Sequence, residues 1–216
     1  MADKRREEDY TFKLLVEGPD DLFVIAHLRE LNQLEDNIFI KPCGSVEKAI
    51  ELFRILIDKQ TANNRILGLV IDADLNMAGR WQRISQILVE NGKYTLPDVL
   101  PNEGLILFPN DSDDVKIGVW VMPDNQLNGM LEDFLAKLAV NDKDLLDEVD
   151  AALEVIEDKK VNKYKAIHKS KARIHTFLAW QEEPGASMGS AIAKSYLRAD
   201  SEQAILFVNW LKNLFC

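Results

Sequence analysis

Acidic side chains directly follow two separate apolar segments of this sequence. The segment VEGPDD supplies Glu17, Asp20 and Asp21, and the segment VIDAD supplies Asp72 and Asp74. Carboxylate oxygens are the hard ligands that Mg²⁺ or Mn²⁺ prefers, and no Cys or His accompanies them as zinc would require. Four or five carboxylates in one place repel one another unless a cation neutralises them. If the two segments meet in space, these residues predict a metal site.

The apolar segments before these carboxylates have the pattern of β-strands, and each is followed by a helical period. Such alternation predicts an α/β fold with a mostly parallel, Rossmann-like sheet and flanking helices. Ligands of these sheets bind at the carboxyl ends of the strands, so adjacent first and third strands would bring Glu17 and Asp72 together. While the backbone stays extended, Asp74 points to the same side as Asp72. The predicted strands are 11–17, 38–42 and 66–72, and the predicted helices lie near 20–31, 45–57 and 78–90.

Each of these acids also has a structural interpretation. Asp20 is a plausible N-cap of the first helix, and Asp21 a first-turn residue favoured by the helix dipole. Asp72 and Asp74 could simply begin a loop, where Asp is common. Carboxylates that end two separate apolar strands nevertheless favour the metal site.

The pattern changes in the second half of the chain. Residues 104–109 and 115–122 flank the turn-rich sequence NDSDD, which predicts a hairpin at the edge of the sheet. From Asn128 onward the apolar residues recur with helical spacing. We therefore predict an α/β domain over 10–125 and a helical C-terminal extension over 126–216 that packs on it.

The composition is that of a globular protein with an acidic excess: 47% of the 216 residues are hydrophobic, 29% are charged, and the net charge is −10. The charged start lacks the apolar core of a signal peptide, and no apolar run is long enough to span a bilayer. The two cysteines have neither metal-ligand spacing nor the density of a disulfide scaffold. We expect a cytoplasmic protein with no membrane partner. The acidic excess alone argues against a broad nucleic-acid-binding surface, because phosphates repel it.

The charge is, however, unevenly distributed. Residues 109–158 contain 3 basic and 14 acidic residues, whereas residues 159–216 contain 10 basic and 4 acidic residues. Seven cations, with no acid between them, predict a local surface for DNA or RNA, and a solvated helix face is the alternative. They are Lys159, Lys160, Lys163, Lys165, Lys169, Lys171 and Arg173.

With Glu17 in LLVEGPDD and Asp72 and Asp74 in LVIDAD, residues 10–92 resemble the toprim (topoisomerase–primase) domain. That family carries a glutamate after its first strand and D-x-D after its third, and it binds Mg²⁺ for phosphodiester chemistry. The segments MPDNQLNGMLEDF and KSKARIHTFLAWQEEPGASMG look like a stand-alone toprim-like bacterial branch. That branch is distantly similar to nucleases of the overcoming-lysogenization-defect type.

The resemblance implies a role for each matching residue. Glu17 would be a general acid/base or a metal ligand, and Asp72 and Asp74 would hold Mg²⁺ (or Mn²⁺) with Asp21 or Asp20 alongside. Glu132, in LEDF, would complete the metal site, although an acid in the first turn of a helix is an equally good interpretation. Lys171 would contact the scissile phosphate, and Lys169 competes for that role.

Two functions remain open at this point. The first is Mg²⁺-dependent phosphodiester chemistry on nucleic acid, most simply by an endonuclease. The second is a non-catalytic toprim-like module that acts with a partner such as an ATPase, since the chain has no P-loop motif of its own. A homo-oligomer is compatible with either. Receiver and haloacid-dehalogenase folds fit less well, because their further motifs are missing or out of order.

Overall fold

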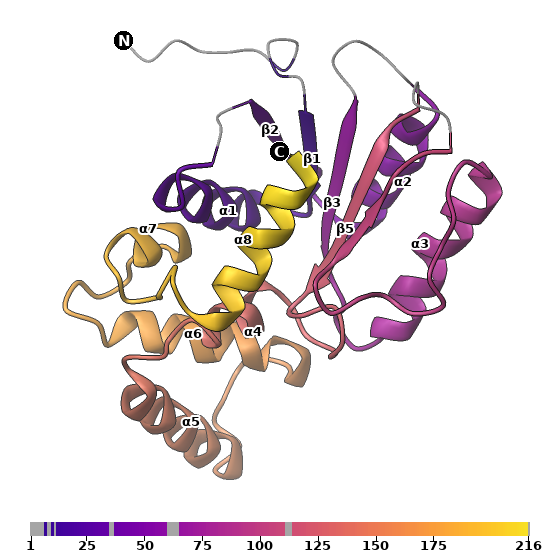
Figure 1. The fold of residues 1–216 in the computed structure, drawn as a ribbon. Helices are drawn as coiled ribbons and strands as arrows, with labels where there is room; N and C mark the ends of the chain where they lie inside the picture. The colour runs from indigo at the N-terminus through magenta and orange to yellow at the C-terminus, as the bar shows by residue number, and fades with distance from the viewer. Residues whose placement is uncertain are drawn as a thin grey trace.

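A computed structural model of the chain describes residues 7, 10, 12–34, 37–59, 65–110 and 114–215. They form an α/β fold built on one five-stranded sheet of order β2-β1-β3-β5-β4 (Figure 1). Pairs β1–β2, β1–β3 and β3–β5 are parallel, and β4 is antiparallel to β5. The mostly parallel, Rossmann-like sheet and the adjacency of β1 and β3 are therefore confirmed. The strands are β1 Phe12–Val16, β2 Ile38–Pro42, β3 Ile66–Asp72, β4 Leu105–Leu107 and β5 Lys116–Met122.

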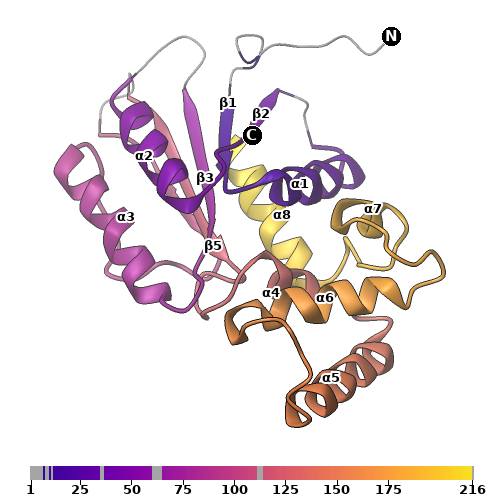
Figure 2. The ribbon, with the colours of Figure 1, turned by 180° about the vertical axis from the view of Figure 1, so that it is seen from behind.

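Helices cover both faces of the sheet. Helices α1 and α8 pack on one face, and α2 and α3 pack on the other, each with its own hydrophobic cluster (Figures 1 and 2). Because helices lie on both faces of the sheet, each connection between parallel strands is compatible with the usual right-handed crossover. The helices that join the parallel strands are α1 Pro19–Leu31, α2 Val46–Ile57 and α3 Met77–Asn91.

The chain after β5 is helical, as predicted. Helices α4 and α6 lie below the carboxyl edge of the sheet, α5 packs outside α6, and α7 packs on α1 (Figures 1 and 2). No described helix is long and apolar enough to cross a membrane. The elements are α4 Leu131–Ala136, α5 Lys143–Asp158, the 3-10 turn η2 Ala166–His168, α6 Lys169–Ala179, α7 Met188–Ala193 and α8 Glu202–Phe215.

The last helix belongs to the same hydrophobic core as the sheet. The Trp120 ring of β5 lies 5.1 Å from the Phe207 ring of α8. Gly68 and Gly118 face each other across β3 and β5, and a Cβ atom on Gly118 would overlap the side chain of Leu214. These glycines let α8 approach the centre of the sheet, so the predicted extension shares its core with the α/β region.

The edge hairpin is confirmed in part. Strand β4 is the edge strand, and it pairs with β5 in the register Leu105 with Val119. The turn that joins them includes residues 111–113, which lie outside the described residues.

Candidate metal and nucleic-acid site

The carboxyl ends of β1 and β3 bring two predicted site residues into direct contact. Glu17 leaves the end of β1, and its Oε1 accepts a hydrogen bond of 2.8 Å from the backbone N–H of Asp72. Asp72 ends β3, and its Oδ1 accepts a hydrogen bond of 2.9 Å from the N–H of Leu131, the first residue of α4. Elements 59 residues apart in the chain are thus joined at one edge.

The first turn of α1 adds two more carboxylates. Gly18 is the N-cap and Pro19 the first helical residue, so the N-cap role considered for Asp20 is wrong. Asp21 accepts a 2.9 Å hydrogen bond from the N–H of Gly18 through Oδ2. Its other oxygen, Oδ1, is buried and has no hydrogen-bond partner among the described residues. A buried carboxylate oxygen without a donor is costly, so this atom is a candidate ligand for a cation.

These groups line one pocket of about 270 Å³. Five predicted carboxylates meet there, and among the described residues Lys171 is the one basic side chain in its wall. The Lys171 Nζ lies 3.6 Å from Oε1 of Glu132, which is only 5% exposed. Sequence reasoning missed Gly44 and Ser45, which reach the pocket because β2 ends at the same edge. The five carboxylates belong to Glu17, Asp20, Asp21, Asp72 and Glu132.

Burial makes the charged forms of these carboxylates unfavourable. Burial, together with the charges of Asp21 and Asp74, raises the pKa of Glu17 to about 7, although the N–H of Asp72 opposes the shift. Burial and the charge of Glu132 raise the pKa of Asp21 to about 6. Burial, and then Asp21 and Glu17, raises the pKa of Asp72 well above its usual value. One lysine does not offset this charge, so the pocket favours a bound cation.

Asp74 does not line this pocket, although its charge raises the pKa of Glu17 and of Asp72. Its φ of 52° takes the backbone out of the extended conformation on which the expectation of a common side with Asp72 depended. Its Oδ2 accepts a 2.6 Å hydrogen bond from Nη2 of Arg80, whose Nε donates to the carbonyl oxygen of Asp72 at 3.0 Å. Sequence reasoning missed Arg80, although a basic residue in the first turns of the next helix is a visible signal.

The donor set fits Mg²⁺, although it is not assembled as a complete cage. Among the described residues, no group of three or more His, Cys, Asp and Glu side chains stands ready to hold a metal ion. Mg²⁺ keeps several water ligands and commonly takes only one or two carboxylates from a protein. The unpartnered oxygen of Asp21 and the neighbouring carboxylates of Glu17 and Asp72 meet that requirement with oxygen donors alone.

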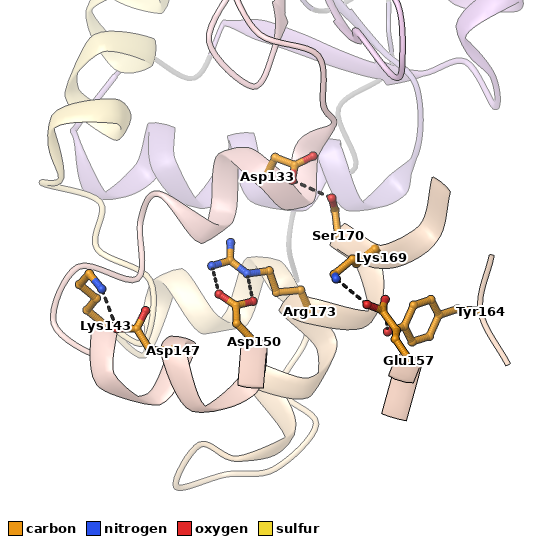
Figure 3. Close-up of polar contacts among 9 residues, drawn as sticks. All are labelled: Asp133, Lys143, Asp147, Asp150, Glu157, Tyr164, Lys169, Ser170 and Arg173. Carbon is orange, nitrogen blue, oxygen red and sulfur yellow. Dashed lines mark hydrogen bonds and ion pairs between the residues drawn. The ribbon is translucent and has the colours of Figure 1, made fainter. Parts of the chain in front are cut away.

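The lysine-rich segment is partly neutralised by α5 (Figure 3). Lys169 Nζ donates to Glu157 at 2.6 Å. Arg173 makes a bidentate pair with Asp150 at 2.6 and 2.7 Å. These cations, which have no acid near them in sequence, therefore meet acids in space. Lys159, Lys160, Lys163 and Lys165 are exposed, and no ion pair joins them to the described part of the chain.

The structure separates the two lysines that compete for the phosphate-contacting role. Lys171 lines the acidic pocket, whereas Lys169 points to Glu157 on α5. The two side chains leave the same helix in different directions because they are two residues apart. Ser170, between them, donates to Asp133 of α4 at 2.7 Å and fixes this face of α6 (Figure 3).

The chain matches a known protein family over nearly its whole length. The family described as "Protein of unknown function (DUF3226)" matches residues 11–216. That range includes the helices and strands named above, the acidic pocket and the lysine-rich segment. No curated protein and no solved structure is significantly similar to the chain.

Proposed function

The chain belongs to the DUF3226 family. We propose that it carries out Mg²⁺-dependent phosphodiester chemistry on nucleic acid, most simply as an endonuclease. The observation that carries the proposal is the pocket in which five carboxylates face a single lysine. A structural ion-pair network would contain comparable numbers of acids and bases. A pocket with such an excess of acid instead suits a cation and a phosphate group.

The proposal includes a toprim relationship. Adjacent β1 and β3, with Glu17 after one and Asp72 at the end of the other, are the arrangement that the resemblance requires. The helical region after β5 contributes Glu132 and Lys171 to the same pocket, as the similarity to overcoming-lysogenization-defect nucleases implies. These agreements support the relationship and the assignment of the site.

The chain's own residues would divide the chemical work. Asp72 and Asp21 would hold Mg²⁺, with Glu132 and Asp20 at its periphery, and the bound ion would stabilise charge on the phosphate oxygens. Glu17, with a pKa of about 7, is suited to accept or donate a proton near neutral pH. Lys171 would offset negative charge on the reacting phosphate. Asp74, whose Oδ2 accepts a hydrogen bond from Arg80, would bind the ion through its other oxygen or after leaving Arg80.

The exposed lysines supply the electrostatic part of the proposal. Lys159, Lys160, Lys163 and Lys165 lie in the connection from α5 to α6, which continues to Lys171 at the pocket. They would contact the phosphates of DNA or RNA without reading the sequence. We propose the cytoplasm as the place of action, where such a substrate occurs.

The first experiment measures cleavage of plasmid, single-stranded DNA and RNA with Mg²⁺ or Mn²⁺ and with EDTA. We expect metal-dependent cleavage by the wild type and a loss of at least about 100-fold in Asp72→Ala, since one key electrostatic group typically contributes that much. Asp72→Asn can still accept the Leu131 hydrogen bond and should be equally inactive. Asp144→Ala, an exposed acid of α5, is the matched control and should keep full activity. Cleavage that persists in Asp72→Ala, or without metal, would overturn the assignment.

One observation favours a second function, a non-catalytic module that acts with a partner such as an ATPase. No ready group of three metal-binding side chains occurs in the described ranges. A thermal shift with Mg²⁺ separates the two functions, because an ion that binds only the folded state raises its stability. A wild type that neither cleaves nor gains thermal stability with Mg²⁺ would favour the binding module.

A further inference from the structure

A second pocket, of about 390 Å³, opens beside the acidic pocket. The connection from β3 to α3 and the first turn of α3 form one wall, and Ile167 of η2 forms the other. Among its lining residues are Leu75, Asn76 and Arg80. This volume lies in the range of small-molecule sites, which is about 300–1,000 Å³.

The two pockets are bounded by the same two segments. Asp72, the last residue of β3, lines the acidic pocket, and the residues of the β3–α3 connection from Ala73 to Asn76 line the second one. In the lysine-rich segment, Lys171 lines the acidic pocket and Ile167, four residues earlier, lines the second. A polymeric ligand with one of its units bound in the acidic pocket would therefore place the neighbouring unit in the second pocket.

The lining of the second pocket combines apolar surface with free hydrogen-bond donors. Leu75 is 70% exposed and Ile167 is 40% exposed, although both are large hydrophobic residues. Arg80 uses Nε and Nη2 for the β3–α3 connection, and its Nη1 bonds to no described residue. The Asn76 Oδ1 caps α3, while its Nδ2 likewise bonds to nothing in the described ranges. An apolar surface with N–H donors at its border matches a nucleobase, which has flat faces and acceptor atoms on its edge.

We propose that this pocket binds the nucleobase next to the phosphate held at the acidic pocket, and that the substrate is therefore a single-stranded polynucleotide. A base in a duplex has both faces covered by stacking and enters a pocket only after it is unpaired and unstacked, which costs free energy, so a single strand supplies the base more readily. The proposal rests on the proposed function for the position of the phosphate. It adds the strand state of the substrate and two specificity-determining residues, Leu75 and Ile167.

The experiment measures equilibrium binding of fluorescein-labelled single-stranded DNA, single-stranded RNA and duplex DNA by anisotropy, with Ca²⁺ in place of Mg²⁺ so that the acidic pocket can hold a cation. We expect wild type to prefer single strands, and the double variant Leu75→Ala/Ile167→Ala to bind them about tenfold more weakly, since it removes most of the apolar surface that the base would cover. Duplex binding, which depends on phosphates, should not change. The DNA and RNA arms identify which sugar the site takes.

The matched control is Val89→Ala/Val99→Ala, which trims two hydrophobic side chains that are 64% and 71% exposed and do not line the pocket. It should bind every probe like the wild type. Because Leu75 and Ile167 are exposed, the double variant should fold, which its thermal unfolding checks. As a measurement without any variant, AMP and dAMP should shift the backbone amide NMR signals of residues 74–80 and 166–168 in the wild type.

The outcomes distinguish this proposal from the proposed function. Unchanged single-strand binding by the double variant, or an equal loss in the control, overturns the nucleobase pocket even if metal-dependent cleavage is found. Loss of single-strand binding in the double variant alone supports the pocket even if the wild type never cleaves. A wild type that prefers duplex overturns the single-stranded substrate.

Discussion

The acidic pocket and the interface between α5 and α6 use the same kinds of side chain in opposite ways. At the interface, Arg173 pairs with Asp150 and Lys169 with Glu157, each at 2.6 Å (Figure 3). In the pocket, five carboxylates share Lys171, whose nearest recorded carboxylate oxygen is 3.6 Å away. Paired acids stabilise helix packing. Acids that are buried without a cation cost stability and are typical of a ligand site.

This difference gives a criterion for recognising a candidate ligand site, which residue type alone does not provide. Asp150 and Glu157 sit in the most acidic part of the sequence, yet both have a cation and a structural role. Asp21 and Asp72 sit in short, unremarkable motifs, yet burial raises the pKa of both. The local excess of buried charge, rather than the number of acids, identifies the candidate site.

The largest effect should be a fall in the stability of the metal-free protein as the pH rises. The pKa of Glu17 is about 7 in the folded state against an ordinary value of 4.5, so the folded state binds more protons between these values. The contribution of Glu17 to stability should therefore be complete below about pH 4.5 and be lost as the pH rises through 7, by roughly 3 kcal/mol. The raised pKa values of Asp21 and Asp72 should add to this fall. Chemical denaturation in EDTA across this range measures it.

Glu17→Gln is the control for this prediction, since its side-chain oxygen can still accept the Asp72 hydrogen bond without a charge. Its stability should change less between pH 4.5 and 7. Carboxylates with a lowered pKa, such as Glu157, alter stability at lower pH and do not interfere. A wild-type stability that rises through this window would contradict an uncompensated pocket.

A smaller effect of opposite sign should distinguish the two regions by mutation. At pH 8 without metal, Asp21→Asn should raise the free energy of unfolding by about 1 kcal/mol, because it removes a buried charge and can still accept from Gly18. Asp150→Asn should lower it by about 1 kcal/mol, because it breaks a bidentate pair with Arg173. Thermal and urea unfolding measure both. If both variants were destabilised equally, the two regions would not differ in the way proposed.

The smallest effect concerns the lysine-rich segment. Lys163→Gln/Lys165→Gln should reduce the slope of log affinity against log salt by about 0.7–0.9 for each lysine that contacts a phosphate. Lys169→Gln should leave that slope nearly unchanged, because Glu157 already holds its ammonium group. Anisotropy titrations from low to moderate salt test this. An equal change in both variants would mean that the Glu157 pair opens when nucleic acid binds.

Much of the fold could be predicted from local patterns. The apolar run that became β3 and the alternating residues of β5 have short-range signals, and both strands lie close to where they were expected. The strand ends also placed Glu17 and Asp72 at one edge, which their hydrogen bond confirms. The path beyond Asp72 could not be predicted in this way, because the bridge between Asp74 and Gly129 ties it to a distant loop.

The sequence by itself determined the α/β alternation, the edge of the sheet where acids collect, and the presence of a basic segment. Only the tertiary structure decided which charges compensate one another. In the folded protein, Lys169 and Arg173 pair with acids of α5, and Asp74 pairs with Arg80. One buried oxygen of Asp21 has no hydrogen-bond partner among the described residues. The physical reason is range: strand and helix patterns depend on neighbouring residues, whereas burial and ion pairing depend on contacts between elements far apart in the chain.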